Sequence, residues 1–289
     1  MVTVVEAYEQ RGTAPLIACD FSPPRSGDPA FGEAAVALDA DFICVAYSPG
    51  KTVRMDSVAA AATVKRDTGR DVIFNLSPRD MNRLAIQMHL LGAQALGLEN
   101  VLVLQGDELS EKDLGRMKGV SDFRPTELVR SIREMNEGLD FKGLKLAAPT
   151  RFCAGATADL GRDLDREARL THRKIEAGAR YLVTQSVYTA IAIEEFRRSY
   201  AVVSGAGLDV PVLFGVQVLV QGGLVFGDVP ESMKAALEAG RPGPEIALEL
   251  ARSLMAAGAE AFYVIPPILK GGARDYEAAG TVIRALRAS

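Results

Sequence analysis

Residues able to do acid–base chemistry or bind a polar ligand follow short apolar runs in this chain of 289 residues. They are two carboxylates, a tyrosine, an arginine and three amides: Asp20, Tyr47, Asn75, Asp107, Arg151, Gln185 and Gln217. A carboxylate can serve as a general acid where burial raises its pKa, and amides add hydrogen bonds without charge. Because the set contains few cations, it favours a neutral heterocyclic ligand over a multiply phosphorylated sugar.

The sequence lacks the residue patterns of several other kinds of active site. The two histidines, His89 and His172, fall inside helical patterns, so neither histidine-based catalysis nor a metal site is expected. No phosphate-binding loop, dinucleotide fingerprint, zinc-protease motif or serine elbow occurs. The three cysteines are odd in number and not spaced as metal ligands. They predict reduced thiols in a cytoplasmic protein, with Cys19 and Cys44 as small apolar fillers.

The polar residues need elements that place them together, and a repeating pattern supplies these. Eight apolar runs of strand length occur, at 16–20, 42–45, 72–75, 101–104, 144–147, 181–184, 212–215 and 262–265. Nearly continuous apolar runs are typical of parallel strands covered on both faces. Helical patterns separate them, as where Met81, Leu84, Ala85, Met88 and Leu91 recur at three- and four-residue steps.

This alternation predicts one α/β domain over 1–289, a single (βα)8 TIM barrel. Its active site would lie at the carboxyl ends of the strands. Residues 240–257 predict an extra turn and helix before the last strand. A doubly wound sheet is the alternative, although it usually has fewer strands and a dinucleotide fingerprint.

Composition excludes several broad classes of protein. With 48% hydrophobic and 24% charged residues, the chain is neither disordered nor fibrous. The formal net charge of −4 gives no reason to expect a nucleic-acid partner. No stretch approaches the ~20 apolar residues of a membrane-spanning helix, so we expect no membrane association.

Four segments, in order and with matching gaps, resemble the methylenetetrahydrofolate reductase family. Residues 20–25 (DFSPPR) are similar to the family's E-F-x-P-P-[RK], and residues 75–83 (NLSPRDMNR) to its H-L-T-x-R-D-x-N-R. Residues 91–107 resemble its L-L-G-x-x-x-x-G-[IL]-x-N-[IV]-L-x-L-x-G-D stretch. Residues 173–185 (RKIEAGARYLVTQ) are similar to its R-K-x-[ED]-A-G-A-x-x-x-x-T-Q. The likeness extends over roughly residues 15–220.

The resemblance implies a flavoenzyme. Members of the family hold FAD at the barrel mouth, accept a hydride from NADH or NADPH, and reduce 5,10-methylenetetrahydrofolate to 5-methyltetrahydrofolate. Asp20 takes the place of the glutamate that helps to protonate N10 of the substrate. Asp107 matches the aspartate near flavin and pterin, whose charge can stabilise a cationic intermediate.

The same resemblance implies further binding residues. Gln185 matches the glutamine that contacts folate or nicotinamide, and we expect Gln217, after the seventh run, to contact substrate as well. Lys174 would neutralise part of the cofactor's diphosphate. Together with Asp107, the flavin site would be lined by Tyr47, Asn75, Gln105, Gly106 and Lys174.

The chain also departs from the family's pattern, which indicates a divergent member. Asp20 is one methylene shorter than glutamate, and a displacement of ~1 Å can cost ~100-fold in rate. Asn75 stands where many members have histidine. Residues 215–219 lack the family's proline, and residues 263–272 replace its usual Y-T-x-N-R ending.

Some charged residues have simpler interpretations. We interpret the Arg79-Asp80 pair and Asn82 as a helix-start cluster, and Arg25 as part of a loop salt bridge. Residues 270–272 (KGG) follow the last strand, where many barrels bind phosphate, but a surface loop is the simpler interpretation.

Three functions stay open. The first is flavin-dependent reduction of methylenetetrahydrofolate, or the reverse oxidation. The second is a pterin-binding barrel that transfers a methyl group without redox chemistry. The third is a barrel subunit that works only with a partner protein. Folate is the expected ligand of the first two, and the third would bind flavin or folate. A homo-oligomer is the expected assembly, with a complex with a partner subunit as the alternative.

Overall fold

A closed barrel of eight parallel strands forms the centre of the computed structural model, which describes residues 2–288. Each strand pairs with the next along the chain, and β8 closes the barrel against β1. The predicted single (βα)8 barrel is therefore confirmed. The strands are β1 Leu16–Phe21, β2 Phe42–Val45, β3 Asp71–Leu76, β4 Asn100–Val103, β5 Cys153–Ala158, β6 Tyr181–Ser186, β7 Val212–Gln217 and β8 Ala261–Ile265.

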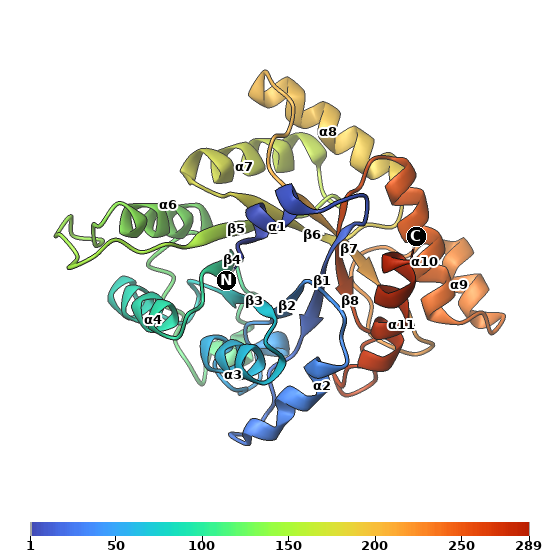
Figure 1. The fold of residues 1–289 in the computed structure, drawn as a ribbon, viewed down its shortest axis with the longest axis horizontal. Coiled ribbons are helices and arrows are strands. Elements are labelled where there is room, and N and C mark those ends of the chain that lie inside the picture. The colour runs from blue at the N-terminus through green and yellow to red at the C-terminus, as the bar shows by residue number, and fades with distance from the viewer. Residues whose placement is uncertain (1, 289) are drawn as a thin grey trace.

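The helices surround the barrel as an outer ring (Figure 1). None of those within residues 2–288 is long and apolar enough to cross a membrane. The α-helices are α1 Val4–Gln10, α2 Glu33–Val36, α3 Ser57–Thr68, α4 Arg83–Ala95, α5 Glu111–Leu114, α6 Pro125–Asn136, α7 Leu164–Ala177, α8 Ala190–Ser204, α9 Glu231–Glu238, α10 Gly243–Ala256 and α11 Tyr276–Arg287. Two short 3-10 helices, η1 Pro29–Gly32 and η2 Pro49–Lys51, follow β1 and β2. The extra helix predicted within 240–257 is α10.

The fifth strand lies later in the chain than the sequence predicts. The run at 144–147 belongs to a small antiparallel turn in which Leu139 bridges Lys145, and Leu144 is 60% exposed. The strand itself is 153–158, with the sequence C-A-G-A-T-A. Small residues have weak strand propensity, but here they leave room for larger neighbours. A Cβ on Gly155 would come 2.2 Å from the Tyr181 ring, so the ring occupies the space that glycine leaves.

Helix α1 closes the amino end of the barrel and leaves the carboxyl end to the loops. It lies inside the ring of helices in Figure 1, and Val4 packs on the inward-facing side chains of the strands. The backbone N–H of Val4 donates to Asn100 Oδ1, and that of Val2 donates to Asp71 Oδ2. Both acceptors are the first residues of their strands. Within the barrel, the carboxyl end is therefore the end that this helix leaves uncovered.

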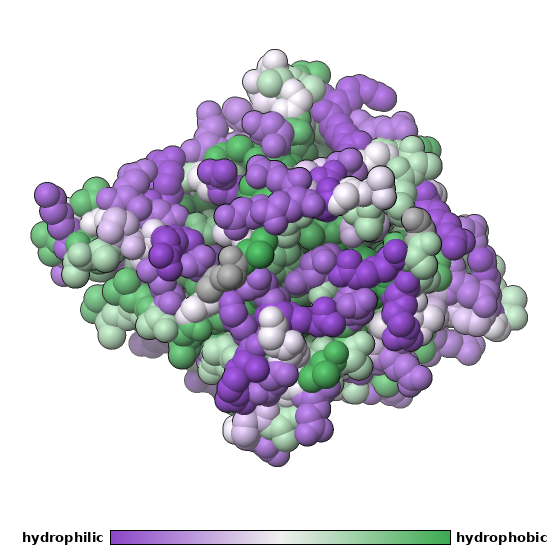
Figure 2. Space-filling view, viewed as in Figure 1, coloured by the Kyte–Doolittle hydropathy of each residue, from purple (hydrophilic) through white to green (hydrophobic). Residues whose placement is uncertain are grey.

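Helix α4 is confirmed, but the apolar residues that indicated it lie mainly on its outer face. Leu84, Met88 and Leu91 are 55%, 63% and 43% exposed, whereas Ile86 and Leu90 are fully buried against the barrel. Hydrophobic side chains gather over this helix in Figure 2. Both faces are apolar, so periodicity alone could not identify the buried one.

Candidate active site

The mouth of the barrel is lined by side chains that alternate inward along the strands. Leu16 and Ala18 face the interior of the barrel, so Asp20 on the same strand faces it one layer higher. By the same alternation Asn75, Gln217 and Tyr263 project inward from β3, β7 and β8, and Gln185 lies at the end of β6, where the pairing with β7 is irregular. The strands therefore bring together at one end four of the residues that the sequence singled out.

Asp20 is buried and already has two partners. The Tyr263 hydroxyl donates to Asp20 Oδ1 at 2.7 Å, and Arg274 Nε lies 3.4 Å from Asp20 Oδ2. The side chains of Asp20 and Arg274 are each only 8% exposed. Burial, followed by the negative charge of Asp20, raises the pKa of Tyr263 well above its usual value. Tyr263 is therefore a neutral donor at physiological pH, and each oxygen of Asp20 accepts one hydrogen bond.

Asn75 is buried beside this group. Its Oδ1 accepts a hydrogen bond from Cys44 Sγ at 3.3 Å, and its carbonyl accepts one from Ser57 Oγ at 2.8 Å. Cys44 faces the barrel interior, and burial raises the pKa of its thiol well above the usual range. Cys19, Cys44 and Cys153 are free and buried, as expected for small apolar fillers.

A second polar cluster joins the loops after β2, β3 and β4. Arg79 binds Asp80 through two hydrogen bonds of 2.7 Å, and Tyr47 Oη donates to Asp80 Oδ2 at 3.0 Å. The Arg79 hydrogen bonds hold the pKa of Asp80 below its usual value, while burial and the charge of Asp80 raise that of Tyr47. Asn82 caps α4, as predicted. The Arg79–Asp80 pair does more than begin a helix, because Arg79 Nη1 also donates to the Asp107 carbonyl at 3.1 Å.

This network holds the loop that carries Gln105, Gly106 and Asp107. The side chains of Gln105 and Asp107 are exposed. Gly106 has φ +76°, and a Cβ there would come 2.5 Å from Ser77 Oγ, so glycine is required at this position. Ser77 Oγ also donates to the Gln105 carbonyl at 3.1 Å. The loop is fixed by its backbone, which leaves its amide and carboxylate side chains available to a ligand.

The two glutamines of the mouth differ in what they contact. Gln185 is exposed at the end of β6. Gln217 is 2% exposed and holds the loop after β7: it accepts from Phe226 N at 2.9 Å and Tyr188 Oη at 3.3 Å, and donates to the Leu224 carbonyl at 2.8 Å. Gln217 thus fixes a loop at the mouth, whereas the side chain of Gln185 makes no hydrogen bond within residues 2–288.

Lys174, which the sequence predicted to contact the cofactor's diphosphate, is buried between α7 and β5. Its Nζ donates to the Thr157 carbonyl at 2.6 Å and lies 3.5 Å from Glu167 Oε1, and both charged side chains are almost fully buried. Burial lowers the pKa of Lys174, and the charge of Glu167 opposes this effect. The ammonium therefore fastens α7 to the end of β5 and faces its partners inside the protein.

Arg151 and Tyr263 show how the register of the strands decides which residues reach the mouth. Because the fifth strand begins at Cys153, Arg151 precedes it, lies at the amino end, and pairs with Glu99 at 3.1 Å. Its apparent place at a strand end was therefore wrong. Sequence reasoning passed over Tyr263, although its inward position on the last strand could have indicated it. No sequence signal pointed to Arg274.

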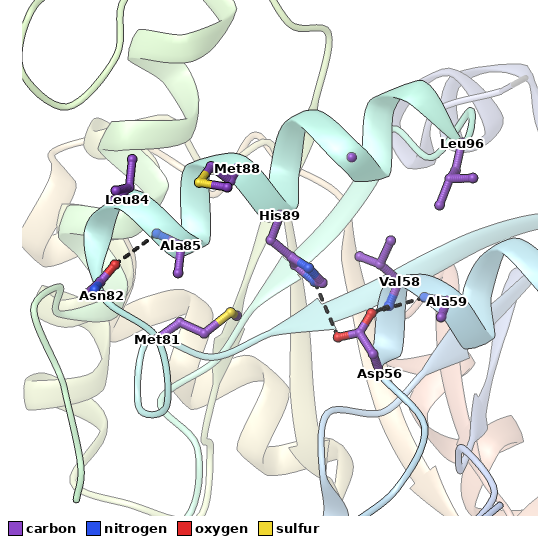
Figure 3. Close-up of a pocket in the computed structure, with 11 residues that line it drawn as sticks. Asp56, Val58, Ala59, Met81, Asn82, Leu84, Ala85, Met88, His89 and Leu96 are labelled. Carbon is purple, nitrogen blue, oxygen red and sulfur yellow. Dashed lines mark hydrogen bonds and ion pairs between the residues drawn. The ribbon is translucent and has the colours of Figure 1, made fainter. Parts of the chain in front are cut away.

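A surface groove lies on the outside of the barrel, between α3 and α4 (Figure 3). It measures about 640 Å³ and is lined mainly by apolar side chains, among them Val58, Met81 and Met88. His89 points across it to Asp56, with Nε2 3.5 Å from Oδ2. His89 therefore lies on the outside of the barrel, between two helices.

Comparison with known proteins gives consistent results. The sequence model of the family described as "Methylenetetrahydrofolate reductase" matches residues 7–262. A Schizosaccharomyces pombe protein named methylenetetrahydrofolate reductase 2 is 28% identical over 71% of this chain and 33% of its own length. A Caenorhabditis elegans protein named probable methylenetetrahydrofolate reductase (NADPH) is 25% identical over 68% of this chain and 29% of its own. The chain thus matches about a third of the length of these relatives.

Two solved structures share the fold. An uncharacterized Clostridium thermocellum protein, described as binding two copies of 5-methyl-5,6,7,8-tetrahydrofolic acid, superposes with a TM-score of 0.70 at 14% identity, over 98% of both chains. A putative lyase/mutase from Burkholderia cenocepacia superposes with a TM-score of 0.50 at 16% identity, over 96% of this chain and 81% of its own. At these identities the likeness concerns the fold alone.

Proposed function

Because this chain belongs to the methylenetetrahydrofolate reductase family, we propose that it interconverts 5,10-methylenetetrahydrofolate and 5-methyltetrahydrofolate, with FAD as cofactor and NADH or NADPH as co-substrate. The observation that carries the proposal is the inward-facing carboxylate of Asp20 at the carboxyl end of β1. It lies in a barrel that the family model covers almost from end to end. A cytoplasmic enzyme of one-carbon metabolism is the corresponding role.

One part of the mouth has polar groups suited to binding the ring of a flavin. Asn75, Gln105 and Tyr47 supply neutral polar groups, and Gly106 brings the backbone close to Ser77 without a side chain between them. Bound flavin would supply hydride transfer between nicotinamide and folate. Asp107, exposed beside these groups, would place a negative charge near a cationic folate intermediate and so stabilise it.

Asp20 would move the proton that the folate ring requires at N10. The substrate would replace the Arg274 contact, which at 3.4 Å is the longer of the two that the carboxylate makes. Tyr263 would keep the carboxylate oriented during this exchange through the hydrogen bond of 2.7 Å. Gln185, with an exposed amide, would bind the pterin or the nicotinamide in turn.

One observation favours the second candidate, a pterin-binding methyltransferase without flavin. Lys174, the cation expected at the flavin diphosphate, is engaged by Thr157 and Glu167. A pterin alone needs no such cation.

The remaining candidate is a subunit that functions with a partner protein, and the rim of the mouth gives it some support. Leu224, Val225, Phe226 and Leu269, in the loops after β7 and β8, are 38% to 57% exposed. These side chains could equally cover a bound ring, so we retain folate reduction by the single chain as the leading proposal.

An absorbance spectrum of the purified protein, followed by anaerobic titration with NADH, NADPH and 5-methyltetrahydrofolate, tests the proposal. We expect bound flavin that is bleached by each productive donor. Asp20→Asn should abolish the folate half-reaction and spare reduction by nicotinamide, whereas Asp209→Asn, an exposed aspartate before β7, should leave both unchanged. Protein that binds folate but takes up no FAD would instead support the methyltransferase, and full folate activity in Asp20→Asn would remove Asp20 from the mechanism.

A further inference from the structure

Three arginines meet where the loops after β1, β2 and β8 come together at the mouth. Arg54 Nη1 donates to the Pro23 carbonyl at 2.8 Å. Its Nη2 lies 3.9 Å from the point that a Cβ on Gly272 would occupy. Arg274 Nη1 donates to the Gly272 carbonyl at 3.3 Å. Arg54 and Arg274 therefore both lie beside Gly272, and Arg25 follows Pro23 by two positions in the loop that Arg54 contacts.

The positive charges of this group are not balanced by carboxylates. Arg274 contacts Asp20, but neither Arg54 nor Arg25 forms an ion pair with any residue in the part of the chain that the structure describes. The prediction that Arg25 takes part in a loop salt bridge is therefore wrong. Burial lowers the pKa of Arg54, and the charges of Arg274 and Arg25 lower it further. Arg54 is partly buried without a carboxylate partner in the described chain, an arrangement that costs stability unless a ligand supplies the counter-charge.

The unused donors of these arginines are also placed to receive one. Within residues 2–288, Nη2 of Arg54 and Nη2 of Arg274 make no hydrogen bond, although each guanidinium is fixed through its other nitrogens. Fixed guanidinium groups bind carboxylate or phosphate oxygens with little further loss of side-chain entropy. Gly272, with φ +89°, leaves space between them.

We infer that Arg54, Arg274 and Arg25 form a binding site for an anionic group, a carboxylate or a phosphate, of the ligand held at the mouth. Only the identity of that ligand rests on the proposed function. A folate would bring the carboxylates of its glutamate, and a dinucleotide would bring its diphosphate. The site would supply the cations that Lys174 does not, and it corrects the expectation of a mouth with little positive charge.

Binding of pyrophosphate tests the site itself. Affinity is measured by calorimetry and by thermal unfolding at constant ionic strength, with chloride as the reference anion. We expect Arg54→Gln to weaken pyrophosphate binding by about 10- to 100-fold, since one charged hydrogen-bonding partner is lost. Arg25→Gln, which removes an exposed cation without breaking a hydrogen bond within residues 2–288, should weaken it in the same direction and keeps the test valid if Arg54→Gln unfolds.

Arg197→Gln is the matched control, because Arg197 also binds loop carbonyls, those of Ala257 and Gly258, but before β8 at the other end of the barrel. It should lower the melting temperature and leave pyrophosphate affinity unchanged. Equal pyrophosphate affinity in wild type, Arg54→Gln and Arg25→Gln would overturn the inference, as would no measurable binding to wild type.

Two further titrations identify the source of the anion. If Arg54→Gln weakens 5-methyltetrahydrofolate but not the same pterin without its glutamate, the site binds the glutamate carboxylates. If it weakens ADP instead, the site binds a dinucleotide diphosphate. Wild-type protein that binds pyrophosphate but neither flavin nor folate would refute the proposed function and leave the anion site standing. Bound flavin in the wild-type protein, together with unchanged pyrophosphate affinity in the arginine variants, would support the proposed function and refute the anion site.

Discussion

Two tyrosines of the barrel interior allow a direct test of the hydrogen bond at Asp20. Tyr263, partly buried, donates to Asp20 at 2.7 Å, whereas the hydroxyl of the fully buried Tyr181 has no hydrogen-bond partner among the described residues. Tyr263→Phe removes a hydrogen bond to a buried charged group, which contributes about 1.5–3 kcal/mol. Tyr181→Phe removes only an unsatisfied polar group, so the free energy of unfolding should stay the same or rise.

The pH dependence of stability gives a second readout of the same pair. Burial raises the pKa of both hydroxyls well above 10 in the folded protein. A raised folded pKa contributes stability that is fully present below pH 10 and is lost as the pH rises from 10 toward the folded value. Wild-type stability should therefore fall above pH 10, and each Phe variant should reduce that slope by an amount that approaches about 1.4 kcal/mol per pH unit as the unfolded tyrosine becomes fully ionised.

Urea-induced unfolding of wild type and both variants, at pH 7 and at several values between 10 and 11, measures these effects. We expect Tyr263→Phe to be destabilised at pH 7 and Tyr181→Phe not to be, while both show the shallower alkaline slope. If the two variants had the same stability at pH 7, the Tyr263 hydroxyl would not contribute a hydrogen bond to Asp20, and the reasoning about the mouth would be refuted.

Two further predictions concern other parts of the barrel. Ile86→Ala should lower the free energy of unfolding by about 2–5 kcal/mol, whereas Met88→Ala, on the outer face of α4, should change it by less than about 0.5 kcal/mol; denaturant unfolding distinguishes them, and equal losses would reverse the assignment of faces. Gln217→Leu removes three hydrogen bonds of a buried amide and should cost about 1.5–4 kcal/mol, with faster proteolysis in the loop after β7. Unchanged proteolysis would show that the amide does not hold this loop.

The barrel could be predicted from the sequence, since seven of the eight strands were predicted close to their observed positions. Strands buried on both faces need nearly continuous apolar residues, and that requirement is visible in a single sequence. The fifth strand could not be found in this way. Its residues are small because Tyr181 and the surrounding helices fill the space, and only the packed structure shows that neighbour.

The sequence also determined which polar residues end most of the strands, and so placed Asp20, Asn75 and Gln185 at one end of the barrel. The partners of those residues were decided by the tertiary structure alone. Arg274 lies 254 positions from Asp20 along the chain, and Arg54 and Gly272 belong to loops whose conformations no short pattern specifies. The contact of Lys174 with Thr157 likewise depends on how α7 packs against β5. Periodicity records which face of an element is buried, but the choice of ionic and hydrogen-bond partners follows from how distant loops come together when the barrel closes.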